Sequence, residues 1–168
     1  MPIISPFQQH PLHDGRQSDL ALMVRRGVQR LCLDLNVHVL PEVSLRSGRR
    51  ADLIGLTRKG EIWIIEIKSS VEDWKADQKW PDYRNYCDRL FFATHAQVPR
   101  GIFPEDCGFI LSDGYGGEIL RDAPEHKLAP ATRKALTLQL ARIGANRLTL
   151  AEMAGVVMPT DEPAGTIS

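Results

Sequence analysis

Three residues in the first half of the chain have the types and spacing of a metal-dependent hydrolytic site. Asp52 is followed after thirteen residues by Glu66, and Lys68 lies two residues further on. Mg²⁺ is usually held in proteins by one or two carboxylates together with water and substrate phosphate oxygens. A lysine beside such an ion orients an attacking water or offsets the charge of a phosphate. The three residues therefore indicate hydrolysis of a phosphate ester at a Mg²⁺ or Mn²⁺ site.

A tight hairpin is expected to connect the two strands that carry these residues. Residues 51–57 and 61–68 are rich in β-branched and aromatic side chains, which is typical of strands. Gly60 suits the left-handed position of a three-residue turn between them. Across such a turn Thr57 faces Glu61, so further strand partners can be counted back from this pair.

The register of the hairpin predicts that the two acids are opposed. Asp52 faces Glu66, and directly opposed residues have Cβ atoms about 5 Å apart. Lys68 shares their face of the sheet, whereas Ile65 and Ile67 point to the other face. Opposed carboxylates on apolar strands repel each other, and a divalent cation would neutralise them. The alternative is a solvent-facing sheet on which the three side chains form a loose surface cluster.

Apolar periodicity and capping residues predict the elements around the hairpin. A helix over residues 18–35 comes first, with Ser18 as its N-cap and Asn36 at its exit. Ser70, with Asp73 three residues on, opens another helix after the hairpin. The remaining expected elements are a strand over residues 37–45, a continuation of the second helix to about residue 87 with a kink or restart at Pro81, a buried strand over residues 90–94, a hairpin of residues 109–112 with 118–121, a helix over residues 130–143 ended by Gly144, and a short helix opened by Thr149 with Glu152.

Composition and length favour one soluble mixed α/β domain over residues 17–155, with an extended arm over 1–16 and a flexible tail over 156–168. Of 168 residues, 43% are hydrophobic and 25% are charged, and 21 basic side chains balance 21 acidic ones. This balance argues against a charge-driven nucleic-acid binder of the histone kind. The sequence contains neither an apolar run long enough for a membrane span nor a signal peptide. Three widely spaced cysteines argue against a disulfide framework or zinc finger, so we expect a cytoplasmic protein.

The Asp52 and Glu66-Ile67-Lys68 pattern, on the second and third strands of an α-β-β-β-α-β order, resembles the signature of the PD-(D/E)XK nuclease superfamily. The chain that follows is similar to the bacterial MmcB-like DNA repair proteins. The resemblance covers about residues 16–145, and its most specific part runs from Arg49 to Ala93. It is carried beyond the hairpin by Ser69, Asp73-Trp74, Lys79-Trp80-Pro81, Tyr83, Tyr86-Cys87-Asp88 and Phe92-Ala93.

This resemblance implies a restriction-endonuclease-like core, with a mixed central sheet flanked by helices, a C-terminal hairpin and further helices, and a role in DNA repair. It also implies that Asp52, Glu66 and the main-chain carbonyl of Ile67 hold Mg²⁺ or Mn²⁺. Lys68 then positions the attacking water. The catalytic residues implied by the resemblance are therefore Asp52, Glu66 and Lys68.

Two departures from the family pattern are present. Ala51 stands where the name of the motif has a proline. Many members carry an extra glutamate on the first helix, and residues 18–35 contain none. Glu42 on the first strand is the nearest substitute as a further metal ligand, provided that the strand register places it on the face of Asp52.

Basic residues around the acids are candidates for contact with the DNA backbone. Arg46, Arg49 and Arg50 lie next to Asp52 in sequence, and Lys75 and Lys79 follow on the next helix. A basic rim around an acidic pocket would hold phosphates. The alternative for such arginines and lysines is a solvated surface.

Aromatic and acidic residues after the hairpin have a structural interpretation. Trp80 and Tyr83 share a helix face, on which stacking of an unpaired base is conceivable, but packing against the sheet is favoured. Asp88 is expected to cap a helix end, to pair with Arg89 or to order the site, and a structural role is favoured.

The hypothesis favoured by these observations is a Mg²⁺- or Mn²⁺-dependent DNA endonuclease that acts in bacterial DNA repair, with DNA and other repair proteins as partners and no membrane association. The second hypothesis is a nuclease-fold module that binds DNA or serves as a scaffold without cutting. The third is an unrelated enzyme that acts on nucleotide or RNA phosphodiesters, because a metal and a lysine do not select the polymer. The oligomeric state is left open by the sequence.

Overall fold

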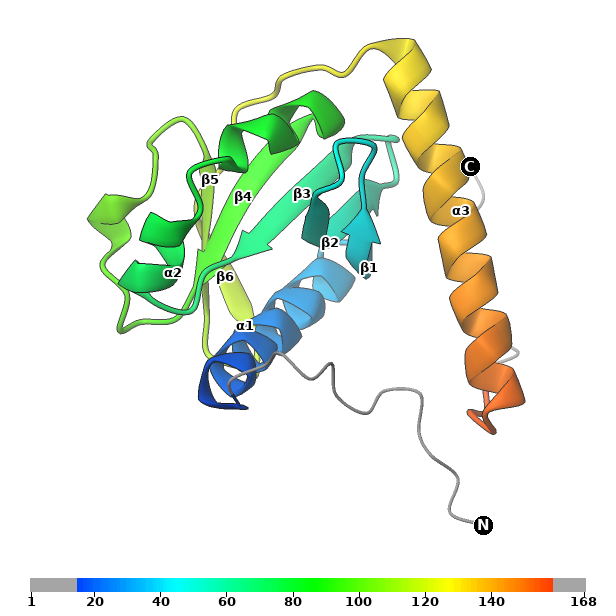
Figure 1. Ribbon diagram of the computed structural model, residues 1–168, viewed down its shortest axis with the longest axis horizontal. Coiled ribbons are helices and arrows are strands. Elements are labelled where there is room, and N and C mark those ends of the chain that lie inside the picture. The colour runs from blue at the N-terminus through cyan, green and yellow to red at the C-terminus, as the bar shows by residue number, and fades with distance from the viewer. Residues whose placement is uncertain (1–14, 159–168) are drawn as a thin grey trace.

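The computed structural model describes residues 15–158, with side chains from residue 19 onward. Most of the expected N-terminal arm and tail, including residues 1–14 and 159–168, lies outside this range. The described residues form one mixed sheet with helices on both faces (Figure 1). The elements are α1 (Gly15–Asp34), β1 (Val37–Ser44), β2 (Arg50–Thr57), β3 (Ile62–Ile67), α2 (Val71–Ala76), the 3-10 helix η1 (Trp80–Tyr86), β4 (Arg89–Thr94), the 3-10 helix η2 (Arg100–Ile102), β5 (Gly108–Ser112), β6 (Gly117–Arg121) and α3 (Pro130–Met153).

The sheet follows chain order from β1 to β6. Its first three strands are antiparallel, β3, β4 and β5 are parallel, and β6 returns antiparallel to β5. The expected α/β class, its α-β-β-β-α-β order and its C-terminal hairpin are thereby confirmed. Within the described residues, every helix is too short or too polar to cross a membrane.

Side-chain alternation divides the core into two apolar clusters, one on each face of the sheet. On one face, α1 packs through Val24 and Val28 against Leu53, Ile65 and Phe91. The opposite face carries Ile54, Ile64 and Phe92 under α2, η1 and the first half of α3. Burial of apolar side chains at roughly 25 cal/mol per Å² makes these two clusters the main source of stability.

Aromatic rings after the hairpin belong to the second cluster. Trp74 and Trp80 meet Phe92 edge to face, with ring centroids 5.0 and 5.4 Å away. The ring of Phe103 stacks on Phe92 at 5.7 Å, and Tyr83 is buried beside them. The favoured interpretation of Trp80 and Tyr83 as core residues is confirmed.

Capping explains several element boundaries. Ser70 is the N-cap of α2, and its hydroxyl accepts a hydrogen bond from the Asp73 amide at 3.0 Å, as predicted. The helix stops at Ala76, and the chain restarts as η1 with Pro81 in its first turn. At the other end of the domain, Asn36 leaves α1 in a left-handed conformation with φ of 56°.

The predicted start of the first helix is wrong. The helix begins at Gly15, so Ser18 lies inside it and is not its N-cap.

The predicted end of the main C-terminal helix is also wrong, because α3 runs through Gly144 to Met153. A side chain at Gly144 would meet Leu40 at ordinary contact distance, so the glycine packs on β1 and does not terminate the helix. Arg147, one turn further, donates to the carbonyl oxygens of Pro41 and Glu42 and fixes the continued helix to this edge strand. The separate short helix expected at Thr149 is therefore part of α3.

Asp88 is a completely buried connection between three parts of the chain. Its carboxylate accepts hydrogen bonds from the amides of Ile62 at 2.7 Å and Leu128 at 3.0 Å. Both guanidinium nitrogens of Arg133 reach it at 2.6 and 2.5 Å. Burial alone would raise the pKa of Asp88, but the Arg133 and backbone hydrogen bonds hold it below its usual range. The structural role is confirmed, although the pairing with Arg89 is wrong, since Arg89 pairs with Glu61.

We expect Asp88→Asn to lower the free energy of unfolding by about 2–4 kcal/mol, because Arg133 would lose its anionic partner inside the fold. Urea unfolding followed by circular dichroism measures this loss. The control is Asp106→Asn, which breaks the exposed Arg84–Asp106 pair and should change stability by less than about 1 kcal/mol. Equal effects of the two substitutions would contradict the role given to Asp88.

Candidate functional site

Asp52 and Glu66 lie together where β2 and β3 stop pairing. The strand ladder runs from Leu56 opposite Ile62 to Leu53 opposite Ile65, which confirms the predicted hairpin register. One step further, the Asp52 amide donates to Glu66 Oε1 at 3.0 Å. The Ile67 amide donates to Asp52 Oδ2 at 2.7 Å. Each carboxylate thus replaces a backbone carbonyl as acceptor, and the two acids are held side by side.

This placement raises the pKa of both carboxyl groups above their usual range. Glu66 is almost fully buried and Asp52 is half-buried. Burial raises the pKa of Asp52, and the Ile67 amide and the charge of Lys68 offset only part of this rise. Burial, followed by the negative charge of Asp52, raises the pKa of Glu66. The pair is therefore suited to bind a cation that would stabilise both negative charges.

Lys68 is buried on the same side but hydrogen-bonds to a different acid. Its Nζ donates to Asp77 Oδ2 at 2.8 Å. Burial by itself lowers the pKa of Lys68, but the hydrogen bond and charge of Asp77 raise it above the usual range. Backbone bonds fix the residue, because its amide donates to Ala93 and its carbonyl accepts from the Thr94 hydroxyl at 2.6 Å. The lysine is held as a charged group at the end of β3.

Arg49 continues this polar chain toward the surface. Its guanidinium lies 3.5 Å from Asp77 and 3.4 Å from Asp82. It also lies over the ring of Tyr83 at 5.4 Å, within cation–π range. The Tyr83 hydroxyl donates to the Arg50 carbonyl at 3.1 Å and thereby fixes the start of β2 beside Asp52.

Asp77 and the polar role of Tyr83 were not predicted from the sequence. Asp77 follows the last residue of α2, and no spacing rule connects it with Lys68. The hydroxyl of Tyr83 reaches the site only because the 3-10 helix η1 lies over this face of the sheet.

Glu42 lies opposite Asp52 on the edge strand. The ladder pairs Pro41 with Leu53 and Val43 with Ala51, so the register is the one that brings Glu42 to the face of Asp52. Its backbone is left-handed, with φ of 51°. The carboxylate is 53% exposed and lies 3.8 Å from Arg50. Its role as a further metal ligand stays a prediction, since in this arrangement it neutralises Arg50.

The other predicted DNA-binding residues are solvent-exposed. Arg46 lies in the β1–β2 turn, Arg50 begins β2, Lys75 lies on α2, and Lys79 precedes η1. All four are accessible to a polymer on the surface. Arg49 differs, because its guanidinium already forms ion pairs with Asp77 and Asp82.

The donors at the site fit a hard ion such as Mg²⁺ or Mn²⁺ better than a softer ion such as Zn²⁺ or Cu²⁺. In the part of the chain that the structure describes, no three His, Cys, Asp or Glu side chains converge as a ready metal cluster. What converges is the pair Asp52 and Glu66, with the main chain of Ile67 bonded to Asp52. An all-oxygen set with one or two carboxylates is what Mg²⁺ uses in proteins, with substrate and water completing the shell.

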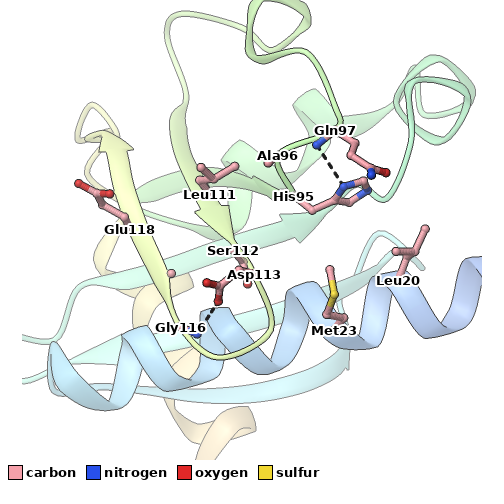
Figure 2. A pocket seen from close by; sticks show the side chains of 11 residues that line it. Leu20, Met23, His95, Ala96, Gln97, Leu111, Ser112, Asp113, Gly116 and Glu118 are labelled. Atoms are coloured by element: carbon pink, nitrogen blue, oxygen red, sulfur yellow. Dashed lines mark hydrogen bonds between the residues drawn. The ribbon is translucent and has the colours of Figure 1, made fainter.

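A pocket of about 630 Å³ lies at the carboxyl ends of β4 and β5. Figure 2 shows Leu20 and Met23 of α1 on one side of it and His95 and Gln97 on the other. His95 follows β4, and its Nε2 donates to the carbonyl of Ser69, the residue after Lys68, at 2.8 Å. The backbone amide of Gln97 donates a hydrogen bond to its Nδ1. Both ring nitrogens are therefore hydrogen-bonded to the backbone, and the imidazole stabilises the chain directly after β3.

Comparison with known proteins adds a family and a structural relative. The family model for DNA repair protein MmcB-like matches residues 8–155. Among solved structures, the SPO1766 protein of unknown function from Silicibacter pomeroyi is similar, with 39% sequence identity and a TM-score of 0.77. The similarity covers 84% of this chain and 97% of that one. None of the curated proteins compared with the chain matches it.

The buried acids predict an unusual pH dependence of stability in the metal-free protein. Because the pKa of Glu66 is raised on folding, the native state keeps a proton that the unfolded chain loses. The free energy of unfolding should therefore fall as the pH rises from about 4.5 to about 8. Glu66→Gln keeps an acceptor for the Asp52 amide, and at pH 8 it should be about 1–3 kcal/mol more stable than the unmodified protein.

Urea unfolding in the presence of a chelator, at several pH values, measures this effect. Glu118→Gln, at an exposed position on β6, is the matched control and should follow the unmodified protein. If Glu66→Gln were less stable than the unmodified protein at pH 8, the ionised Glu66 carboxylate would not destabilise the fold, and the prediction would be wrong.

Proposed function

The chain belongs to the MmcB-like DNA repair family, and we propose that it is a Mg²⁺- or Mn²⁺-dependent DNA nuclease of the PD-(D/E)XK type. The observation that carries this proposal is the buried pair of Asp52 and Glu66, each fixed by the backbone of the opposing strand. Such a pair is destabilising as a structural device and useful as a cation site. Lys68, directly after β3, supplies the positive group that hydrolysis of a phosphodiester needs.

In this proposal Asp52 and Glu66 hold the ion, and the Ile67 carbonyl adds a main-chain oxygen. The bound ion supplies Lewis-acid stabilisation of the scissile phosphate and an activated water. Because the two carboxylates are already oriented by backbone amides, they would need little reorganisation to hold such an ion.

Lys68 orients the attacking water and stabilises the charge that develops on the phosphate. The water oxygen forms the new bond to phosphorus and gives up a proton to bulk water. The bond to the leaving ester oxygen breaks, and that oxygen takes up a proton from bulk water. Asp77 holds the ammonium at 2.8 Å, which keeps the lysine charged and in a defined position. Arg49 and Tyr83 support that position from the side of η1.

A second candidate function is a DNA-binding or scaffolding module that no longer cuts. It is favoured by the partner of Lys68, because the ammonium hydrogen-bonds to Asp77 and not to either buried acid. The absence of a glutamate from the sequence of α1 points in the same direction.

Cleavage assays distinguish the two functions. Single-stranded, duplex, branched and damaged DNA should be incubated with the protein and Mg²⁺ or Mn²⁺, with RNA substrates as controls. Cleavage of DNA that is lost in Asp52→Asn and Glu66→Gln supports the nuclease. Binding of DNA without cleavage of any substrate, and without Mn²⁺ binding in calorimetry, supports the module. Cleavage of RNA alone would favour a different phosphodiesterase.

Metal binding and chemistry should respond differently to substitution of the site residues. Asp52→Asn removes an anionic ligand and should weaken Mn²⁺ binding measured by calorimetry. Lys68→Ala removes a nearby positive charge, so Mn²⁺ should bind equally or more tightly. The same variant should cut at least about 100-fold more slowly, because the water and the phosphate lose their cationic partner. Unchanged cutting by Lys68→Ala would refute the role of this lysine.

Exposed arginines beside the site should contribute to DNA affinity. The double substitution Arg46→Glu and Arg50→Glu should weaken binding about tenfold or more and flatten its dependence on salt, because phosphate contacts release counterions. Fluorescence anisotropy over a salt series measures both effects. Arg26→Glu is the control, since this exposed arginine lies on α1 over the other face of the sheet. If the control and the double variant bound DNA equally well, Arg46 and Arg50 would not contact the DNA backbone.

A further inference from the structure

The outer side of α3 carries an exposed stripe that has no function in the fold. Leu138, Ala141, Ala145 and Leu148 recur at three- and four-residue steps and therefore lie on one side of the helix. All four are exposed, and the two leucines are 56% and 51% accessible. In Figure 1 α3 lies along one side of the molecule, with this length of helix beyond the edge of the sheet.

This stripe is opposite the side by which α3 is attached to the domain. The attached side consists of Leu136, Leu140 and Ile143, which join the apolar cluster, and of Arg147, which bonds to β1. A helix that is apolar on one side faces a single core, whereas a helix that is apolar on opposite sides meets protein on both. The sequence of α3 is of the second kind, so its outer side has the composition of an interface.

We propose that this stripe pairs with α3 of a second copy of the chain, with the two helices antiparallel. The argument for a second copy is charge complementarity. Lys134 and Glu152 continue the stripe at its two ends, four residues before Leu138 and four after Leu148. Both are exposed, and neither has an ion-pair partner among the described residues. Glu152 is the one acidic residue of α3.

A two-fold axis midway between residues 141 and 145 satisfies both charges at once. It places Lys134 of each copy opposite Glu152 of the other, and it places Leu138 opposite Leu148. Ala141 then lies opposite Ala145 beside the axis, and the small alanines allow the helices to approach closely. A parallel pairing would instead place Lys134 against Lys134, which is repulsive. The stripe is therefore self-complementary, as a two-fold interface requires.

Sedimentation velocity of the full chain over a wide concentration range tests the proposal. The unmodified protein should approach twice the 18.8 kDa mass of one chain as concentration rises. Leu148→Asp should stay monomeric, because it buries two carboxylates, each against Leu138 of the other copy. Lys134→Glu and Glu152→Lys should each raise the dissociation constant about tenfold or more, since symmetry applies each like-charge contact twice.

The combination of Lys134→Glu with Glu152→Lys is the decisive variant. It restores opposite charges across the axis, so it should dimerise like the unmodified protein. Leu33→Asp, which replaces an exposed leucine on α1, is the matched control and should leave the mass unchanged. Circular dichroism confirms that each variant is folded. A monomer at all concentrations, a dimer that survives Leu148→Asp, or a double variant as weak as the single ones would each overturn the proposal.

Discussion

Two carboxylates confined at the end of one β-hairpin are the constraint around which this domain is arranged. Asp52 and Glu66 would repel each other in any register that opposes them, and burial increases that repulsion. The structure contains it by ending the ladder at Leu53 and Ile65 and by giving each acid a backbone amide of the other strand. The hydrogen-bonding capacity of two strand ends is thereby used to orient acids.

The positive charges near this pair are themselves fixed by further acids. Lys68 is held by Asp77, and Arg49 lies between Asp77 and Asp82. This alternation of charges extends from the buried end of β3 to the surface beside η1. A buried charge is tolerated when it is paired and hydrogen-bonded. Because Asp77 pairs with Lys68, the lysine stays charged and close to Asp52 and Glu66 without forming an ion pair with either of them.

The hairpin could be predicted from the sequence because neighbouring residues determine its turn and its register. Gly60 fixed the turn, the turn fixed the register, and the register brought Asp52 to Glu66. The rules failed where distant segments decide. Nothing near Lys68 in sequence indicates Asp77 as its partner, and the effect of Gly144 depends on Leu40, about a hundred residues earlier. Arg133 as the partner of Asp88 is likewise set by tertiary packing, since 45 residues separate them.

The continuous α3 has a consequence for the site, because it joins both ends of the hairpin. Arg133 in its first turn bonds to Asp88 and to the Gly60 carbonyl, at the turn where β3 begins. Arg147, about 21 Å further along the helix at 1.5 Å per residue, bonds to the carbonyl of Glu42, opposite Asp52. The six residues of β3 span about 20 Å at 3.3 Å per residue. A helix that stopped at Gly144 would still contact β1 through Gln139 and Leu40, but it would lack the Arg147 bonds to the carbonyl groups of Pro41 and Glu42.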